Sequence, residues 1–197
     1  MRLTERKMQR KREQILQTAI SIIKSHGYSG ATMELISSEL LMTKGSLYYY
    51  FKNKSDLMYQ CHNFVLSQAI KDHEEILAKN LNQRQTLYEM VCLHIDYAVE
   101  QKETFNLIME PKRFFKQEQL EPVLKLRKTY ETIFDQTIEK GIKAGDFQSD
   151  DYKVARLFIL GAMNWIQQWY SPEGQLTKQE LKDLYFDYIM KILGGKE

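Results

Sequence analysis

Helix-breaking residues are scarce along this chain, and that scarcity limits its fold more than any other feature. Only three prolines and nine glycines occur in 197 residues. Apolar residues recur at intervals of three and four, which places them on one face of a helix, whereas a strand would need them at every second position. The sequence therefore predicts an all-α fold, and we find no convincing strand in it.

Capping residues and breaks divide the chain into successive segments. Thr32, Thr43, Ser55 and Thr177 are placed to cap helices, as is Asp150 or its neighbour Asp151. Pro122 fits the first turn of another helix. We expect helices over residues 4–26, 33–40, 43–51, 55–79, 83–101, 103–109, 122–144, 152–170 and 177–192.

Charge is distributed unevenly along the chain. Residues 1–54 hold ten Lys and Arg against four Asp and Glu, a balance of +6, and the rest of the chain carries −4. A basic module suits a polyanionic partner, although a charge run is as often a solvated helix face. We therefore predict a helix-turn-helix DNA-binding domain over residues 1–54, as argued below, and a helical effector-binding and dimerisation domain over residues 55–197.

The sequence favours neither a membrane protein nor an enzyme. No apolar run is long enough to span a membrane, and the charged N-terminus is unlike a signal peptide, so we expect a cytoplasmic protein without a membrane partner. The two cysteines lie 31 residues apart without metal-ligand spacing, and the four histidines are scattered along the chain. We assign no catalytic residue, no metal and no cofactor.

The stretch TKGSLYYYFKNK, Thr43 to Lys54, carries the clearest functional signal. It forms the second of two short helices joined by a tight turn, which is the pattern of a helix-turn-helix. Small and basic residues open this helix, so its first turn can approach a major groove, while Leu47 and Phe51 face inward. Gly45 permits close approach, and Lys44 offers donors to a guanine edge or a phosphate.

From Gly27 to Leu57 the chain strongly resembles the TetR family of bacterial transcriptional repressors. The resemblance rests on GYSGATMELIS and LLMTKGSLYYYFKNKSDL, and it departs from the family at Leu41, where the turn often has glycine. Packing is the alternative role for the three tyrosines of this segment. The resemblance implies DNA contacts from the following residues: Thr32, Thr43, Lys44, Gly45, Ser46, Tyr48, Tyr49, Tyr50 and Lys54.

The same resemblance implies a second helical domain that dimerises and encloses an effector pocket. The last two helices are the candidate dimer interface, because they combine small residues with a large apolar area; an intramolecular core is the alternative. The residues expected at this interface are Leu157, Phe158, Gly161, Ala162, Trp165, Tyr185, Tyr188 and Ile192.

The segment GAMNWIQQWYSPEG, residues 161–174, resembles the subgroup of the family that regulates acyl-CoA degradation. An acyl chain needs apolar and adaptable side chains, and the segment PKRFFK at residues 111–116 pairs positive charge with phenylalanine. The candidate effector contacts, each of which also suits an ordinary core or a solvated surface, are Met90, His94, Tyr97, Phe105, Met109, Arg113, Phe114 and Phe134.

Taken together, these features predict a ligand-responsive repressor that binds a palindromic double-stranded DNA operator as a homodimer. A hydrophobic small molecule, with long-chain acyl-CoA as the candidate, would release it. Two alternatives stay open: a constitutive DNA-binding protein without an effector, and a regulator controlled by a partner protein. A cavity of roughly 300 Å³ or more in the second domain would favour an effector.

Overall fold

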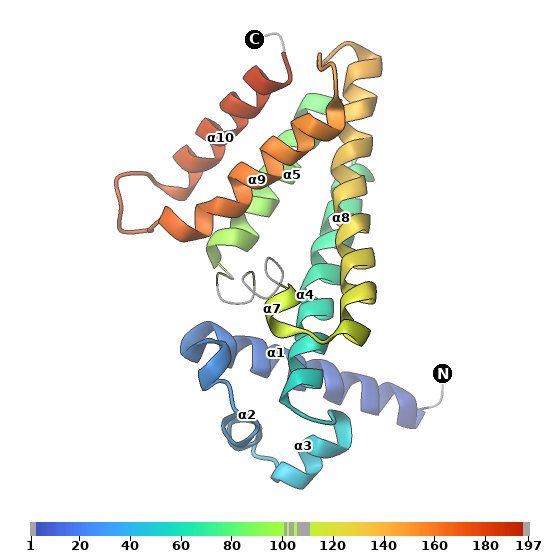
Figure 1. The fold of residues 1–197 in the computed structure, drawn as a ribbon, viewed down its shortest axis with the longest axis vertical. Coiled ribbons are helices and arrows are strands. Elements are labelled where there is room, and N and C mark those ends of the chain that lie inside the picture. Colours follow the sequence, from blue (N-terminus) through green and yellow to red (C-terminus); the bar gives the residue numbers. More distant parts are fainter. Residues whose placement is uncertain (1–2, 101, 103–104, 106–110, 195–197) are drawn as a thin grey trace. The chain divides into compact units, whose positions relative to one another are not determined.

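The computed structural model describes residues 3–100, 102, 105 and 111–194, and every regular element in those ranges is an α-helix. The elements are α1 (Leu3–Gly30), α2 (Met33–Glu39), α3 (Lys44–Tyr50), α4 (Lys54–Leu77), α5 (Gln83–Glu100), α7 (Pro111–Phe114), α8 (Gln117–Ala144), α9 (Tyr152–Trp169) and α10 (Lys178–Ile192) (Figure 1). The predicted all-α fold is confirmed. The helix expected over residues 103–109 lies outside the described residues except at Phe105. The candidate effector residue Met109 is therefore not described.

Contacts divide the chain into two compact units. The first unit comprises residues 1–66 and 103–124, and the second comprises residues 67–102 and 125–197. The long helices α4 and α8 each contribute one part to either unit. The predicted domain division after residue 54 stays a prediction. No described helix combines the length and the apolar character that crossing a membrane requires.

The core of the first unit joins α1, α2, α3 and the start of α4. Ile15 and Ile23 of α1, Ile36 of α2, Leu47 of α3 and Leu57 of α4 are fully buried together. Phe51 follows α3 and is buried with them, as its spacing from Leu47 predicts. These anchors fix α3 against α1 and α2 and leave its first turn exposed to solvent.

Local signals set most helix ends in this unit. Gly27 leaves the helical conformation at φ 69°, as the predicted stop requires, and one further turn runs to Gly30. Thr32 and Thr43 cap α2 and α3, each by accepting a backbone N–H through its side chain. The predicted cap at Ser55 is wrong, because the Asn53 Oδ1 accepts from the Asp56 N–H at 2.9 Å and α4 already begins at Lys54.

Pro122 does not open a helix, so that prediction is wrong as well. The helix α8 begins five residues earlier, at Gln117, and contains the proline. As the sixth residue of α8, the proline forgoes one helical backbone hydrogen bond just after the first turn, since the Leu120 N–H already bonds to the Lys116 carbonyl. The good helix formers Gln117 and Glu118 extend the helix across the position.

The turn between α2 and α3 contains a strained leucine. Leu41 has φ 52° and is 96% exposed, so its side chain gains nothing from burial. The left-handed conformation costs a leucine about 1–2 kcal/mol. The strain suspected from the sequence at this departure from the family turn is therefore present.

Substituting Leu41→Gly is expected to stabilise the protein slightly. Relief of the strain outweighs the greater flexibility that glycine gives the unfolded chain, for a net gain of up to about 1 kcal/mol. Thermal unfolding should show a midpoint higher by about 2–4 °C. The variant Leu40→Gly, at φ −82° and partly buried against the core, should lower the midpoint instead; a lower midpoint for Leu41→Gly too would contradict this account.

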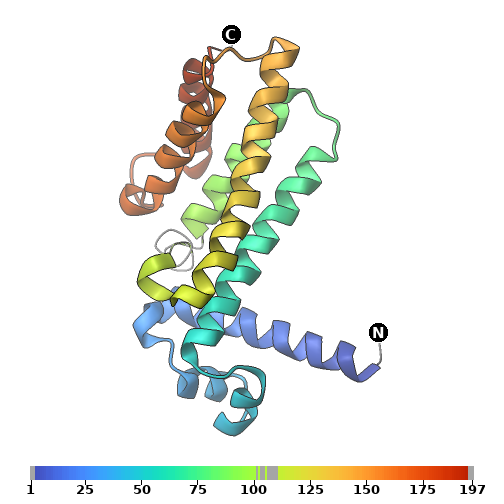
Figure 2. The ribbon, with the colours of Figure 1, turned by 45° about the vertical axis from the view of Figure 1, so that its right-hand side comes forward.

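In the second unit, α5 packs against α9 and α10, and α9 and α10 pack against each other (Figures 1 and 2). Asp151 caps α9 by accepting from the Lys153 and Val154 N–H groups, which selects it over Asp150. Thr177 and Glu180 form the predicted capping box at α10. Gly145, at φ 81°, follows the end of α8 as expected.

Candidate DNA-binding and effector regions

The first turn of α3 is held in shape by its cap. The Thr43 Oγ1 accepts from the Ser46 N–H at 3.1 Å and lies 2.8 Å from the Ser46 hydroxyl. Gly45 follows Lys44 in this turn with open space around it, since an added Cβ would only just reach the Thr43 hydroxyl, at 3.9 Å. A rigid, sterically open helix start of this kind can approach a groove wall closely.

The three tyrosines of α3 differ in exposure. Tyr49 is 76% exposed, Tyr48 is less so, and Tyr50 is half-buried with its ring edge-on to Tyr49 at 5.3 Å. Packing therefore accounts for part of Tyr50 but for little of Tyr49. The hydroxyl best placed to reach a phosphate is the Tyr49 hydroxyl.

Lys44 is ion-paired within the chain. Its ammonium contacts the Glu34 carboxylate of α2, and it lies 6.0 Å from the centre of the Tyr48 ring. The hydrogen bond from Lys44 lowers the pKa of Glu34, and the same bond raises the pKa of Lys44. Both groups are consequently charged at neutral pH, on the surface of the helix-turn-helix.

Lys54 turns away from the end of α3. Its ammonium donates to the Ser29 carbonyl at 3.1 Å and lies 4.7 Å from the centre of the Tyr28 ring. Partial burial lowers the pKa of this lysine. Lys54 thus fastens the start of α4 to the turn that follows Gly27, a role that the sequence did not suggest.

Phe105 and Phe114 are among the candidate effector residues that belong to the first unit. Phe105 is buried, and Phe114 of α7 packs on Tyr28 with ring centres 4.8 Å apart. Its neighbour Phe115 is buried against His62 at 5.3 Å. The short helix α7 is therefore part of the same hydrophobic cluster that supports α1 and α4. The side chain of Arg113 is outside the described set.

Met90, His94 and Phe134 are buried in the second unit. The His94 Nδ1 lies 2.8 Å from the Tyr130 hydroxyl, which is 3.3 Å from the His73 Nε2. The His73 Nδ1 in turn donates to the Ala69 carbonyl at 2.7 Å, which fixes the proton of His73 on that nitrogen. The three rings form one buried network that packs on Phe134.

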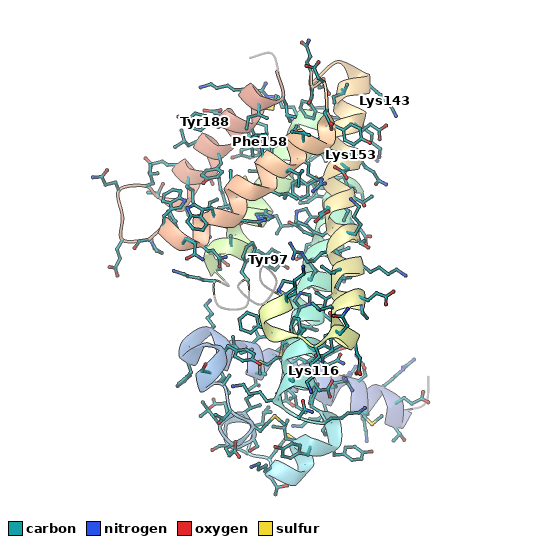
Figure 3. All side chains as sticks on the ribbon, viewed as in Figure 1. Tyr97, Lys116, Lys143, Lys153, Phe158 and Tyr188 are labelled. Atoms are coloured by element: carbon teal, nitrogen blue, oxygen red, sulfur yellow. The ribbon has the colours of Figure 1, made fainter. Side chains whose placement is uncertain are left out.

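Burial keeps this network uncharged. Desolvation, followed by the proximity of His73, lowers the pKa of His94 to about 3, with a side-chain hydrogen bond to Asn164 opposing the shift. The pKa of His73 is lowered as well, chiefly by burial. Beside the network, the half-buried Tyr97 of α5 (Figure 3) donates to the Asp72 carboxylate at 2.6 Å. At neutral pH the surroundings of His94 are thus polar but without net charge on the histidines.

A separate groove of about 350 Å³ opens on the second unit. It satisfies the size criterion for a ligand site, but among the described residues Lys79 is the one basic residue that lines it, against the carboxylates of Asp72, Glu75, Glu89 and Asp96. Their negative charge would repel the phosphates of a coenzyme A thioester. Volume alone therefore does not make this groove an acyl-CoA site.

Two family models match the chain. One is described as the C-terminal domain of tetracyclin repressor-like proteins and spans residues 80–193, more than half of the chain; the other, described as bacterial regulatory proteins of the tetR family, spans residues 15–61. The chain belongs to the TetR family. A TetR-family regulator is not an enzyme, in agreement with the prediction from the sequence.

Known proteins similar to this TetR-family chain are regulators of transcription. The HTH-type transcriptional repressor KstR2 of Rhodococcus jostii is 24% identical over 194 residues, covering 94% of this chain and 92% of KstR2. The structure of AibR in complex with isovaleryl coenzyme A and operator DNA superposes with a TM-score of 0.78 at 23% identity, covering 91% and 97% of the two chains. FadR from Bacillus subtilis in complex with stearoyl-CoA gives 0.75 at 20% identity, covering 90% and 97%.

The exposed apolar face of this TetR-family chain lies on α9 and α10. Phe158 of α9 is 66% exposed and Tyr188 of α10 is exposed as well (Figure 3). Trp165 of α9 is 65% exposed, and Ile192 of α10 is also exposed. We call this the α9/α10 face; it also includes Val154, Leu157, Gly161, Ala162, Trp169 and Leu184. Every predicted dimer residue lies on it except Tyr185, which is half-buried and donates to the Ala162 carbonyl of its own chain at 3.4 Å.

Proposed function

We propose that this TetR-family protein is a ligand-responsive repressor that binds a palindromic operator as a homodimer and is released by a hydrophobic effector. Long-chain acyl-CoA is the candidate effector. The observation that carries the DNA-binding half is the exposed, capped first turn of α3, supported from beneath by buried Leu47 and Phe51 in the segment that the DNA-binding family model matches.

At the operator, α3 would lie in the major groove. Thr43, Lys44, Gly45 and Ser46 would approach base edges and backbone, and the exposed Tyr49 would donate to a flanking phosphate. Tyr48, Tyr50 and Thr32 complete the set of proposed DNA contacts, and each would contribute less to the affinity than Tyr49 does. Lys54 would have to leave the Ser29 carbonyl before it could reach a phosphate, so its contribution is the smallest.

The α9/α10 face supplies the proposed dimer interface. A cluster of large exposed apolar side chains is costly in water unless a partner covers it. Gly161 lies within this face, and an added Cβ there would meet no atom within 4 Å, so packing within its own chain does not require a glycine. A second copy would cover the face by a two-fold contact between helix pairs, placing two α3 helices about 34–36 Å apart on successive major grooves.

Release would follow from a preference of the effector for a dimer state with mismatched spacing. An effector shifts the balance only by its differential affinity for the two states. The buried Met90 and Phe134 offer apolar, adaptable contacts to an acyl chain, and His94 and Tyr97 offer neutral polar ones. FadR, a structural neighbour, is described in complex with stearoyl-CoA, which supports this choice of ligand class. Phe105, Met109, Arg113 and Phe114 remain proposed contacts.

The DNA-binding assignment is tested by fluorescence anisotropy on duplex DNA from upstream of the protein's own gene, at fixed salt. Lys44→Ala should weaken binding about tenfold or more, as expected for a lost charged hydrogen bond, and Tyr49→Phe about fivefold. Lys71→Ala and Tyr152→Phe, which make the same changes in the second unit, should bind as the wild type does. Undiminished affinity in both α3 variants would sink the assignment.

A further inference from the structure

The pair formed by Glu34 and Lys44 joins the two helices of the helix-turn-helix. Glu34 is the second residue of α2, and Lys44 is the first residue of α3. Their side chains are 62% and 51% exposed, so the pair lies on the surface, where a DNA backbone can compete for the lysine. The α2 helix presents this carboxylate two residues after its cap, Thr32.

An ammonium group held by a carboxylate is a poor partner for a phosphate. A lysine on non-operator DNA gains mainly the sequence-independent attraction of phosphates and the release of counterions. To gain it, Lys44 must leave Glu34, and the bared carboxylate then faces the same polyanion. On an operator, a guanine edge offers Lys44 two acceptors in a fixed arrangement. These two hydrogen bonds compensate for the lost Glu34 contact better than a phosphate contact does.

We propose that Glu34 of α2 is a specificity-determining residue that acts on the DNA-reading helix α3: it retains Lys44 on non-operator DNA and yields it where a matching base edge is present. This inference rests on the proposed DNA-binding function. In this scheme Glu34 lowers affinity for every sequence, but it lowers affinity for random sequence more. The protein thereby gives up some binding strength for a larger ratio between operator and random DNA.

The test is the variant Glu34→Gln, which keeps the size of the side chain and removes its charge. Binding is measured by anisotropy on a random-sequence duplex and on the upstream duplex of the same length, over a series of salt concentrations. We expect affinity for the random duplex to rise roughly fivefold at about 0.1 M salt and the salt slope to steepen by about one phosphate contact. Affinity for the upstream duplex should rise less.

Two further variants separate this role from simple charge removal. Glu39→Gln makes the same change at the end of α2, where the side chain is exposed, and measures the effect of charge alone. In the Lys44→Ala background, Glu34→Gln should have no more effect than Glu39→Gln has. A Glu34→Gln variant that matches Glu39→Gln in the native background, or that keeps its full effect without Lys44, would overturn the inference.

Failure of the proposed function has a different outcome. In that case the wild type would bind neither duplex in a salt-dependent manner, and the role of Glu34 would fall with it. Wild-type binding with an unchanged Glu34→Gln profile would instead leave the DNA-binding function in place and refute only the role of Glu34. Equal thermal unfolding midpoints for the wild type and Glu34→Gln would show that the fold is intact in either case.

Discussion

Replacement of Arg156 by methionine is expected to lower the free energy of unfolding by about 3–5 kcal/mol. The Arg156 Nε donates to the Asp135 Oδ1 at 2.7 Å, and its Nη1 lies 3.5 Å from the Glu131 carboxylate. Arg156 and Asp135 are only 6% and 8% exposed, so removal of the guanidinium leaves a buried carboxylate without its main partner. Lys128, whose ammonium is 3.8 Å from Asp135, is largely exposed and cannot replace it.

Urea unfolding followed by tryptophan fluorescence measures this effect in the relevant unit, because both tryptophans of the chain, Trp165 and Trp169, lie on α9. The control Lys143→Met breaks an exposed ion pair with Glu139 and should cost less than about 0.5 kcal/mol. Adding Asp135→Asn to the Arg156 variant should restore much of the lost stability. A cost for Arg156→Met no larger than that of the control would show that the pair contributes little.

If the α9/α10 face forms the proposed dimer interface, the variant Trp165→Glu is expected to convert the protein to a monomer and to weaken operator binding at least 100-fold. In a two-fold interface each substitution acts twice, and buried tryptophans commonly contribute about 2–4 kcal/mol each. A carboxylate on the α9/α10 face also carries a desolvation cost whenever a partner covers it. Loss of the dimer then removes the gain from binding two half-sites together.

Sedimentation velocity over a range of protein concentrations measures the oligomeric state, and anisotropy on the upstream duplex measures the DNA affinity. Leu124→Glu makes a similar change at an exposed leucine of α8 in the first unit and should leave the dimer intact. If the wild type sediments as a monomer, or if Trp165→Glu remains a dimer, the α9/α10 face is not the interface.

Sequence alone predicted those features that depend on a few neighbouring residues. The caps at Thr32, Thr43 and Thr177, the stop at Gly27 and the strain at Leu41 all follow from local backbone chemistry, and the structure shows each of them. The inward positions of Leu47 and Phe51 follow from their helical spacing. For this reason the helix-turn-helix was the most predictable part of the fold.

The sequence did not predict which side chains would find partners on other helices. Lys54 appeared to be free for a phosphate, yet it binds the end of α1, 25 residues away in sequence. The network of His73, Tyr130 and His94 requires side chains from three helices to pack together, and no local sequence pattern predicts that packing. Arg156 did leave a signal, because it stands one turn inside a largely apolar helix whose other charge, Lys153, lies at the exposed helix start, and a buried partner is the usual explanation for such a charge.

The central claim is that DNA binding and effector binding are coupled in this protein. It is tested most directly by titrating the complex with the upstream duplex, at fixed salt, with stearoyl-CoA and with free coenzyme A as the matched control. Loss of anisotropy with stearoyl-CoA but not with coenzyme A is the predicted result. Specific DNA binding that stearoyl-CoA leaves unchanged would contradict the claim and favour a repressor that acts without this class of ligand.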